Sequence, residues 1–472
     1  FSYNKKKKTQ TQGLGRERKR GIMEEIRRKR VLMVPAPFEG HLPSMMNLVS
    51  SLSSKGFSIT IVRTQYNFKD ISAKFPHLHF VTIDDGLSGS TLGLVDFLLK
   101  LNSVCEPLLK EFITLHNDVD FIIYDEFVYF PRQVAEDLNL PKMVFSASSA
   151  VTSISRCVLM DLQENGLLPP QDERSQLEEV VPEFHPFRYK DLPVTAYGSM
   201  EGLMLLYGNV SNRGSSCGII HNSSESIEKD FTSAAQDKWG VQVYSVGPLH
   251  MTDFATSCPS LFDEERNCLE WLDKQQPNSV IYISIGSLAM TKEEEFVEMA
   301  MGLVQSKQPF LWAIRPGSIT GDESLDSLPE QFRETVTEGR GFVVKWAPQK
   351  EVLGHPAVGG FWNHCGWNST LESISCGVPM ICRPYSGDQW VNTRLMTHEW
   401  QTALEVDGEL DRGIVEMAVR RLIVGPEGEE MRNRATKLKA KVEVSVRIGG
   451  SSHSALNSLV DSIWSSSSSI GV

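Results

Sequence analysis

Two side chains in the first third of the sequence, His41 and Asp125, are suited to acid–base chemistry. Each follows an apolar segment with the composition of a buried strand, at 30–35 and at 119–124. Residues that follow the strands of a parallel sheet lie at its carboxyl edge, where ligands bind. A carboxylate bonded to one imidazole nitrogen fixes the tautomer and makes the other nitrogen a better base. The pair is therefore a candidate general base with its orienting carboxylate. A histidine that only caps a helix is the alternative.

The segment 358–372 has the features of an anion-binding site. An apolar strand at 358–362 leads into a turn that contains Gly366, and a helix begins there. The N-terminus of a helix presents free backbone N–H groups and the positive end of a dipole to an anion. The side chains of His364, Asn368 and Ser369 add further donors, so a diphosphate would fit. An ordinary helix cap is the alternative.

Side chains on either side of this segment are suited to the rest of a nucleotide sugar. Trp346 offers a flat face for a nucleobase, and Glu372 could accept two hydroxyl hydrogens, as a ribose would offer. Asp388 and Gln389, after a strand at 379–382, could bind sugar hydroxyls. Core packing is the alternative for the tryptophan, since large aromatic residues are mostly buried.

The composition limits the class of protein. With 472 residues, the chain exceeds one ordinary core, so we expect two domains. The net charge is −12, but residues 1–30 contribute +9, so the remainder carries −21, which argues against nucleic acid as a ligand. No apolar run is long enough for a membrane span, no secretory signal is recognisable, and the eight cysteines form no regular framework. We therefore expect a cytoplasmic protein with reduced thiols.

Short apolar strands alternate with helical stretches in two series, which is the pattern of an α/β fold with parallel sheets. Strands of the first series are predicted at 30–35, 57–62, 78–83, 119–124, 142–146 and 218–221. Those of the second are predicted at 279–285, 309–314, 341–345, 358–362 and 379–382, with an exposed loop at 315–340. The predicted organisation is a disordered basic tail at 1–29, an N-terminal domain at 30–247, a linker at 248–263, a C-terminal domain at 264–450 and a C-terminal helix at 451–464 that could pack back on the N-terminal domain.

The residues from 346 to 389 resemble the signature box of the plant family 1 UDP-glycosyltransferases, with the sequence WAPQKEVLGHPAVGGFWNHCGWNSTLESISCGVPMICRPYSGDQ. The resemblance extends from about residue 31 to about residue 464. It includes PFEGH at 37–41, YD at 124–125, EWLD at 270–273 and VIYISIGS at 280–287. The family implies the GT-B fold, in which two Rossmann-like domains with parallel sheets face each other across a cleft.

The resemblance also implies a donor and a role for individual residues. The donor would be UDP-glucose, held mainly by the C-terminal domain, with no permanently bound cofactor and no metal. Trp346 would stack on the uracil, the backbone of Ala347 would pair with its edge, and Gln349 and Glu372 would hold the ribose. The residues near the phosphates would be Gly286, Ser287, His364, Gly366, Asn368 and Ser369, and those at the sugar Trp367, Asp388 and Gln389. Trp367 and Gln389 together favour glucose over galactose.

The same resemblance identifies His41 as the catalytic base and Asp125 as its orienting carboxylate. A single displacement then implies inversion at the anomeric carbon and a β-glucoside product. One departure concerns the loop after the strand at 142–146, where the family often has a threonine that touches the donor. Here Ala147 takes that place, and Ser148 beside it is the expected substitute. A DxD sequence at 118–120, which could bind a divalent ion, is better interpreted as a turn with solvated carboxylates.

The acceptor is expected to bind the N-terminal domain, at Phe38, Phe127, Met200 and Leu203. These apolar residues suit a phenolic, flavonoid or terpenoid aglycone, with ordinary core packing as the alternative for each. We expect a monomer that binds only the UDP-sugar and a small acceptor. Three other functions stay open: C-glucosylation of a phloroglucinol-type ring, nucleotide-sugar binding without turnover, and, most remotely, an NAD-type dehydrogenase. The last lacks the glycine-rich G-x-G-x-x-G, because PAPFEG stands at 35–40.

Overall fold

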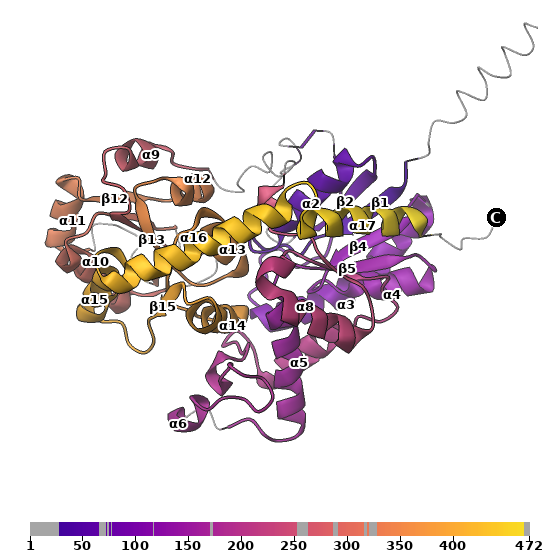
Figure 1. The fold of residues 1–472 in the computed structure, drawn as a ribbon. Coiled ribbons are helices and arrows are strands. Elements are labelled where there is room, and N and C mark those ends of the chain that lie inside the picture. Colours follow the sequence, from indigo (N-terminus) through magenta and orange to yellow (C-terminus); the bar gives the residue numbers. More distant parts are fainter. Residues whose placement is uncertain are drawn as a thin grey trace, which may run out of the picture.

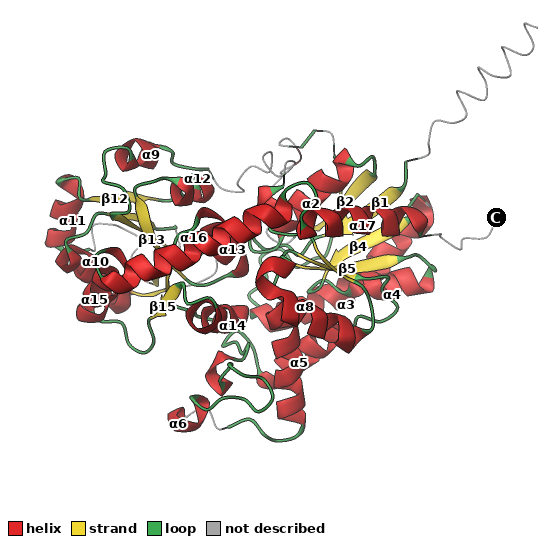
Figure 2. Cartoon of the chain, in the orientation of Figure 1, coloured by secondary structure: helices red, strands yellow, loops and turns green. Residues whose placement is uncertain are grey.

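The computed structural model describes residues 28–65, 72, 75–76, 78–116, 118–169, 173–252, 263–286, 291–315, 319–320 and 328–466. They form two lobes, each built on one parallel sheet with helices packed around it (Figures 1 and 2). The two-domain α/β architecture predicted from the alternating pattern is therefore confirmed. Almost all of the predicted basic tail, and residues 253–262 of the predicted linker, lie outside the described residues.

The sheet of the N-terminal domain has seven parallel strands in the order β3-β2-β1-β4-β5-β6-β7. The order reverses between β1 and β4, and in doubly wound folds ligands bind at such a switch point. The strands are β1 (Arg30–Val34), β2 (Ser58–Thr64), β3 (His79–Ile83), β4 (Phe121–Asp125), β5 (Lys142–Ser146), β6 (Ile219–His221) and β7 (Val243–Ser245). The helices are α2 (Leu42–Ser54), α3 (Leu94–His116), α4 (Phe130–Asp137), α5 (Ala150–Glu164), α6 (Arg174–Leu177), α7 (Met200–Ser211) and α8 (Glu225–Trp239).

The sheet of the C-terminal domain has six parallel strands in the order β12-β10-β8-β13-β14-β15, with its switch point between β8 and β13. The strands are β8 (Val280–Ser284), β10 (Phe310–Ala313), β12 (Gly341–Val344), β13 (Val358–Asn363), β14 (Met380–Cys382) and β15 (Ala403–Glu405). A separate pair joins β9 (Thr291–Lys292) and β11 (Ile319–Thr320). The helices are α9 (Asn267–Leu272), α10 (Glu293–Ser306), α11 (Glu330–Thr337), α12 (Gln349–Gly354), α13 (Trp367–Cys376), α14 (Asp388–Arg394), α15 (Arg412–Ile423), α16 (Pro426–Val446) and α17 (Ser451–Ser465).

The prediction of an exposed loop over 315–340 is wrong for its second half. Helix α11 occupies Glu330–Thr337 and buries Phe332, which stacks on Phe310 with ring centroids 5.4 Å apart. The charged residues between its few apolar positions make the segment polar overall, although those positions repeat at helical spacing. The polar composition of this segment therefore gave no indication that α11 is an amphipathic helix.

The last two helices connect the domains. Helix α16 packs on α13 and α15 of the C-terminal domain, and α17 packs on the N-terminal domain, where it contacts β7 and α8. Figure 1 shows the two helices as one yellow band that runs from one lobe to the other. Apolar residues of α17 (Leu456, Leu459 and Ile463) are buried in the core that also contains β1 and β2. The end of the chain thus contributes to both lobes, with α16 in the C-terminal domain and α17 packed on the N-terminal domain.

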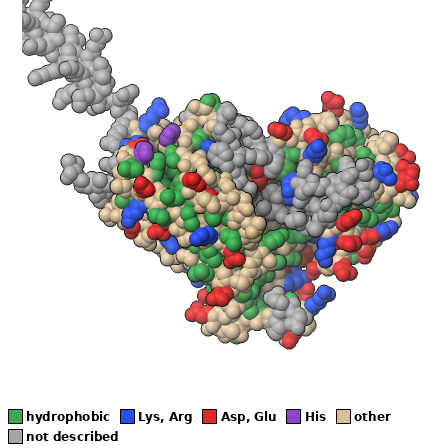
Figure 3. All heavy atoms as spheres, turned by 180° about the vertical axis from the view of Figure 1, so that it is seen from behind, with side chains coloured by type: hydrophobic (Ala, Val, Ile, Leu, Met, Phe, Trp, Pro, Cys, Tyr) green, Lys and Arg blue, Asp and Glu red, His purple; other side chains and the backbone are tan. Residues whose placement is uncertain are grey.

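The surface carries charges of both signs. On the face in Figure 3, acidic and basic side chains are interspersed over both lobes. No helix among the described residues is long and apolar enough to cross a membrane.

Candidate active site

His41 and Asp125 meet at the switch point of the N-terminal sheet. Strands β1 and β4 pair in parallel, with Val34 beside Tyr124, so the residues after them lie at the same edge. His41 immediately precedes α2, and Asp125 is the last residue of β4. Nδ1 of His41 lies 2.8 Å from Oδ2 of Asp125, whose other oxygen accepts a hydrogen bond from the backbone N–H of Phe127 at 3.0 Å. The Asp125 side chain is fully buried, so its carboxylate is held in one orientation.

The surroundings of His41 favour its protonated form. Burial alone would lower the pKa of this imidazole, but the carboxylates of Asp125, Glu126 and Asp388 outweigh that effect and raise it above the ordinary value. A carboxylate can only accept hydrogen bonds, so Nδ1 carries the hydrogen and Nε2 of the neutral ring is left to accept a proton. The ring of Phe127 lies edge-on to His41, with centroids 5.4 Å apart. This arrangement suits a general base.

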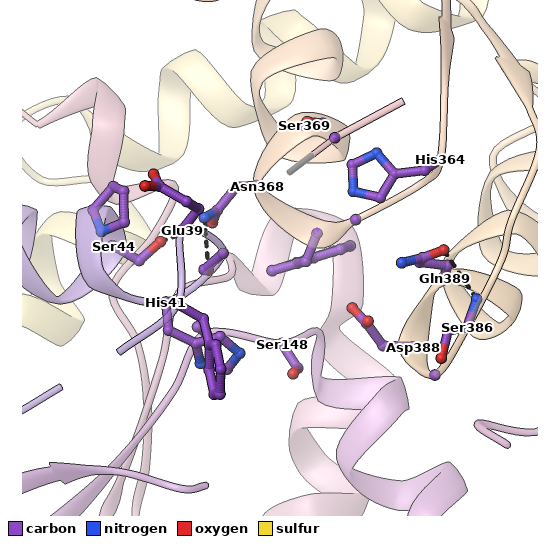
Figure 4. A pocket seen from close by; sticks show the side chains of 18 of the residues that line it. Glu39, His41, Ser44, Ser148, His364, Asn368, Ser369, Ser386, Asp388 and Gln389 are labelled. Atoms are coloured by element: carbon purple, nitrogen blue, oxygen red, sulfur yellow. Dashed lines mark hydrogen bonds between the residues drawn. The ribbon is translucent and has the colours of Figure 1, made fainter. Parts of the chain in front are cut away.

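A cavity of about 470 Å³ lies between the two domains and is lined by both. His41 borders it, while Asp125 lies behind His41 and does not. Figure 4 shows His41, Ser44 and Ser148 on one side and His364, Ser369 and Asp388 on the other. All the donor-site residues named from the sequence line it, except Ser287, which lies outside the described residues: Gly286, Trp346, Ala347, Gln349, His364, Gly366, Trp367, Asn368, Ser369, Glu372, Asp388 and Gln389, with Ser148 from the N-terminal domain.

The switch point of the C-terminal sheet forms the anion-binding end of the cavity. Gly286, which follows β8, has a φ of +84°, and Gly366 is the N-cap of α13. A Cβ added to Gly286 would lie 2.4 Å from the imidazole of His364, and one added to Gly366 would lie 2.5 Å from it. Burial lowers the pKa of His364 to about 4, so the ring is neutral at pH 7 and can donate a hydrogen bond without carrying charge. Its Nδ1 is buried with no partner among the described residues.

Polar side chains at the neighbouring end of the cavity are bonded to one another. Nε2 of Gln349 donates to Oε2 of Glu372 at 2.8 Å and to Ser369 at 3.1 Å, while its Oε1 accepts from the hydroxyl of Tyr282 at 3.2 Å. Burial raises the pKa of Glu372. Trp346, partly exposed, lines the cavity beside these groups. A carboxylate beside an aromatic face has the chemistry to bind a ribose and its base.

The three residues that the sequence assigned to the donor sugar, Trp367, Asp388 and Gln389, line the cavity. Oε1 of Gln389 accepts from the backbone N–H groups of Tyr385 and Ser386 at 2.8 and 3.1 Å, which leaves its amide hydrogens to donate. Burial raises the pKa of Asp388, which borders the cavity. The indole N–H of Trp367 donates to the carbonyl oxygen of Asn222 at 2.8 Å, so any contact of Trp367 with a sugar would use its ring.

Ser148 belongs to a buried ionic network that the sequence did not indicate. Its Oγ accepts from Arg156 at 2.9 Å, and Arg156 also pairs with Glu126 at 2.8 Å. Glu126 accepts from Arg213 as well, at 2.9 Å, and the two guanidinium groups hold the pKa of Glu126 well below its usual range although burial acts in the opposite direction. Arg156 lines the cavity. A charged side chain in the middle of an amphipathic helix has no sequence signal that distinguishes it from a surface residue.

Of the four residues predicted to bind the acceptor, three line the cavity and one does not. Phe38, Phe127 and Leu203 line the cavity, together with Leu94, Val95, Leu98, Leu206 and Tyr207. Met200 does not line it. As the first residue of α7, it is only partly buried and packs against the large core cluster instead. Arg156 lies over the rings of Phe127 and Tyr207, so this mainly apolar half of the cavity also contains one buried cation.

Direct contacts between the domains involve two residues that the sequence did not single out, Ser44 and Asn222. Asn368 donates to the carbonyl oxygen of Gly40 at 2.8 Å and accepts from Ser44 at 2.7 Å. Asn222 donates to Oδ1 of Asn368 at 3.5 Å and, within its own domain, to Ser44 at 3.1 Å. Asn222 directly follows β6, so the rule that identified His41 and Asp125 would also have found it.

Comparisons with known proteins agree with this geometry. Residues 254–437 match the family described as UDP-glucoronosyl and UDP-glucosyl transferase. UDP-glycosyltransferase 76D1 of Arabidopsis thaliana is 76% identical over 445 residues, which are 93% of this chain and 98% of the relative. Flavonol 3-O-glucosyltransferase UGT76E12 of the same plant is 48% identical over 451 residues, again 93% and 98%.

Solved structures give the same result for the fold. Phytolacca americana UGT2 complexed with UDP-2fluoro-glucose and pterostilbene superposes with a TM-score of 0.79 at 25% identity, covering 92% of this chain and all of the other. Medicago truncatula UGT71G1 complexed with UDP-glucose gives 0.78 at 24% identity, covering 92% and 98%. The predicted GT-B fold is thus confirmed, and the site belongs to a UDP-sugar-dependent glycosyltransferase. The chain is a member of the plant family 1 UDP-glycosyltransferases, as the signature box predicted.

Metal ligands are not gathered in the part of the chain that the structure describes, since no group of three or more His, Cys, Asp or Glu side chains there is arranged to hold an ion. Asp120 of the DxD sequence binds Arg30, with an Oδ1 to Nη2 distance of 3.0 Å.

Proposed function

We propose that this protein transfers glucose from UDP-glucose to a hydroxyl group of a small, largely apolar acceptor, with inversion at the anomeric carbon. The position of His41 carries the proposal. Its Nδ1 binds a buried carboxylate at 2.8 Å, and its ring borders the same cavity as the donor-type side chains of the other domain. A general base and a nucleotide-sugar subsite on opposite walls of one cavity are what a direct displacement requires.

In the proposed reaction, Nε2 of His41 takes the proton of the acceptor hydroxyl as the oxygen bonds to the anomeric carbon. The bond from that carbon to the phosphate oxygen breaks, and its electron pair leaves with UDP. Asp125 stabilises the imidazolium that forms. Backbone N–H groups at the start of α13 and the neutral ring of His364 would donate to the diphosphate as its negative charge grows, so the proposal includes no metal.

Glucose and a phenolic acceptor are supported by different observations. Gln389 has its carbonyl oxygen fixed by two backbone N–H groups, which presents its amide hydrogens at the sugar end. One relative is named a flavonol 3-O-glucosyltransferase, and one structural neighbour is complexed with pterostilbene. Apolar and aromatic side chains dominate the acceptor half here, which suits a planar phenolic such as a flavonoid and, second, a terpenoid.

The test is UDP release from UDP-glucose, UDP-galactose and UDP-glucuronate with a panel of phenolic and terpenoid acceptors. We expect turnover with UDP-glucose, and a loss of roughly 10²-fold to 10⁴-fold in kcat for His41→Ala with UDP binding retained. His116→Ala, an exposed histidine at the end of α3, is the matched control. UDP-glucose binding without turnover of any acceptor would indicate a non-catalytic binding protein. Fragmentation of the product by mass spectrometry separates O-glucosides from C-glucosides.

A further inference from the structure

Asn392 is fully buried where α14 meets the N-terminal domain. It follows Asp388 by one helical turn, so the two side chains lie on the same face of α14. Nδ2 of Asn392 donates to Oδ2 of Asp388 at 2.9 Å and to the carbonyl oxygen of Cys365 at 3.0 Å. Its Oδ1 accepts from the hydroxyl of Ser149, in the other domain, at 3.0 Å. One carboxamide therefore connects the sugar end of the cavity, the turn before α13 and the N-terminal domain.

These contacts fix the orientation of the carboxamide. Both hydrogens of Nδ2 point at oxygen atoms, and Oδ1 points at a donor. A flipped amide would place its oxygen against the carboxylate of Asp388 and the carbonyl oxygen of Cys365, and would leave its hydrogens without acceptors. Because unsatisfied buried polar groups are costly, the observed orientation is strongly preferred.

The hydroxyl of Ser149 is oriented to donate to Oδ1 of Asn392. It is the N-cap of α5, where its Oγ accepts from the backbone N–H of Thr152 at 3.2 Å. A hydroxyl has one hydrogen to donate, and here that hydrogen goes to Asn392, so the Thr152 hydroxyl, 2.6 Å away, acts as a donor to Ser149. The start of α5 and the middle of α14 are thus joined by a hydrogen bond that exists only while the two domains are in contact.

We propose that Asn392 is a positioning residue, which holds the carboxylate of Asp388 in the orientation that binds the hexose and, through Ser149, makes that orientation depend on contact between the domains. This inference rests on the proposed function, in which Asp388 contacts the donor sugar. Asp388 would otherwise be free to rotate about its side-chain bonds, since among the side chains of the described residues Asn392 alone donates a hydrogen bond to its oxygens.

The charges around Asp388 are consistent with this role. Burial raises the pKa of its carboxyl group, whereas Arg156, the hydrogen bond from Asn392 and His41 act in the opposite direction. Arg156 and His41 belong to the N-terminal domain, and the carboxylate belongs to the C-terminal domain. Contact between the domains therefore supplies both the cations that favour the ionised carboxylate and the serine that orients its hydrogen-bond donor.

The test compares the affinity for UDP-glucose with that for UDP, in the absence of acceptor, in the full-length protein. The dissociation constant for UDP-glucose divided by that for UDP reports on the sugar end of the cavity. This ratio cancels effects on the binding of the nucleotide and the diphosphate. We expect Asn392→Ala to raise this ratio about tenfold and Ser149→Ala to raise it about fivefold, the size of one lost hydrogen bond. Ser149→Thr keeps the hydroxyl and should leave the ratio unchanged.

Two controls separate positioning from stability. Asp411 caps α15 through Gly413 and Ile414 and does not line the cavity, so Asp411→Ala removes a helix cap on another element and should leave the ratio unchanged. Asp388→Asn should raise the ratio by itself. If Asp388→Asn raises the ratio but neither Asn392→Ala nor Ser149→Ala does, the inference fails while the proposed function stands. If Asp388→Asn has no effect, the sugar-binding role of Asp388 fails first. If Asn392→Ala does not fold, the effect of Ser149→Ala on the ratio decides whether the inference holds.

Discussion

At the scale of single residues, two of the three histidines that line the cavity, His41 and His364, have opposite electrostatic surroundings. His41 is near three carboxylates, which outweigh the effect of burial and raise its pKa. His364 is buried between two glycines, with no charged group to offset its desolvation, and its pKa falls to about 4. His41 therefore titrates at a higher pH than His364, which stays a neutral donor at pH 7. This difference suits His41 to its proposed role as the base and His364 to its proposed role as a neutral donor to the diphosphate.

The raised pKa of His41 predicts the pH dependence of turnover. His41 must be neutral to accept a proton, so kcat/KM should fall with decreasing pH through an apparent pKa above the ordinary value of about 6.5. Asp125→Asn removes the nearest of the charges that raise this pKa, so the acid limb should move to lower pH while the rate at the plateau falls. Initial rates from pH 5 to 9 check both effects. An acid limb that stays in place in Asp125→Asn would contradict the assignment of His41 as the titrating base.

The stability that His41 contributes depends on pH in the opposite direction from turnover. A histidine whose pKa is raised by folding stabilises the folded protein below its unfolded pKa, and this contribution is lost as the pH rises through the folded value. His41 should therefore add stability under mildly acidic conditions, where the proposed base is protonated. His116→Ala, the exposed control, should change neither profile.

At the scale of elements, each sheet places its functional groups at the switch point. In the C-terminal domain, β8 and β13 are neighbours, and the residues after them, Gly286 and His364, come into contact. A glycine is required at 286 for two reasons, because its φ is +84° and because a Cβ there would meet the imidazole at 2.4 Å. A Cβ at Gly366 would meet the same ring at 2.5 Å.

We therefore expect Gly286→Ala to weaken UDP binding about tenfold or more, through displacement of His364 and overpacking of roughly 1–3 kcal/mol. Gly339→Ala is a matched control, because Gly339 has the same φ of +84° but open space around its Cβ position. That variant has the backbone strain without the steric clash, and should bind UDP normally. Calorimetric titration with UDP measures both. Equal loss of affinity in the two variants would show that strain, and not the contact with His364, causes the effect.

The sequence predicted those elements whose signal is local. Apolar strands followed by polar residues placed His41, Asp125 and the anion-binding turn at the correct edges, because a strand and the turn after it are adjacent in the chain. Strands β7 and β15, of three residues each, were missed, although β6 and β14 are equally short and were predicted. Ser44 and Asn392 were missed because their partners in the other domain, Asn368 and Ser149, lie 324 and 243 residues away in the sequence. Such contacts depend on how the two domains meet, which no local pattern encodes.

At the scale of the whole molecule, the cleft depends on contacts that hold the two lobes together. The backbone N–H of Gly387 donates to the carbonyl oxygen of Val194 at 2.8 Å, immediately before Asp388. Near it, Lys190 and Asp407 pair across the domains at 2.7 Å. The end of the chain adds a larger contact, since α17 leaves the C-terminal domain and is built into the core of the other lobe. The C-terminal helix therefore contributes to the stability of the domain that carries the base.

This arrangement predicts that a core substitution in α17 acts on the N-terminal domain. Leu459 is fully buried, so Leu459→Ala should cost about 2–5 kcal/mol, as other large-to-small core substitutions do. Ser458, beside it and exposed, gives the control Ser458→Ala. Because two domains need not unfold together, thermal unfolding should be followed both by calorimetry and by the protection that UDP gives to the C-terminal domain. We expect Leu459→Ala to lower the transition that UDP does not protect, with the affinity for UDP at 25 °C unchanged. A lowered UDP affinity with an unchanged transition would mean that α17 acts on the donor site and not on the lobe in which it is buried.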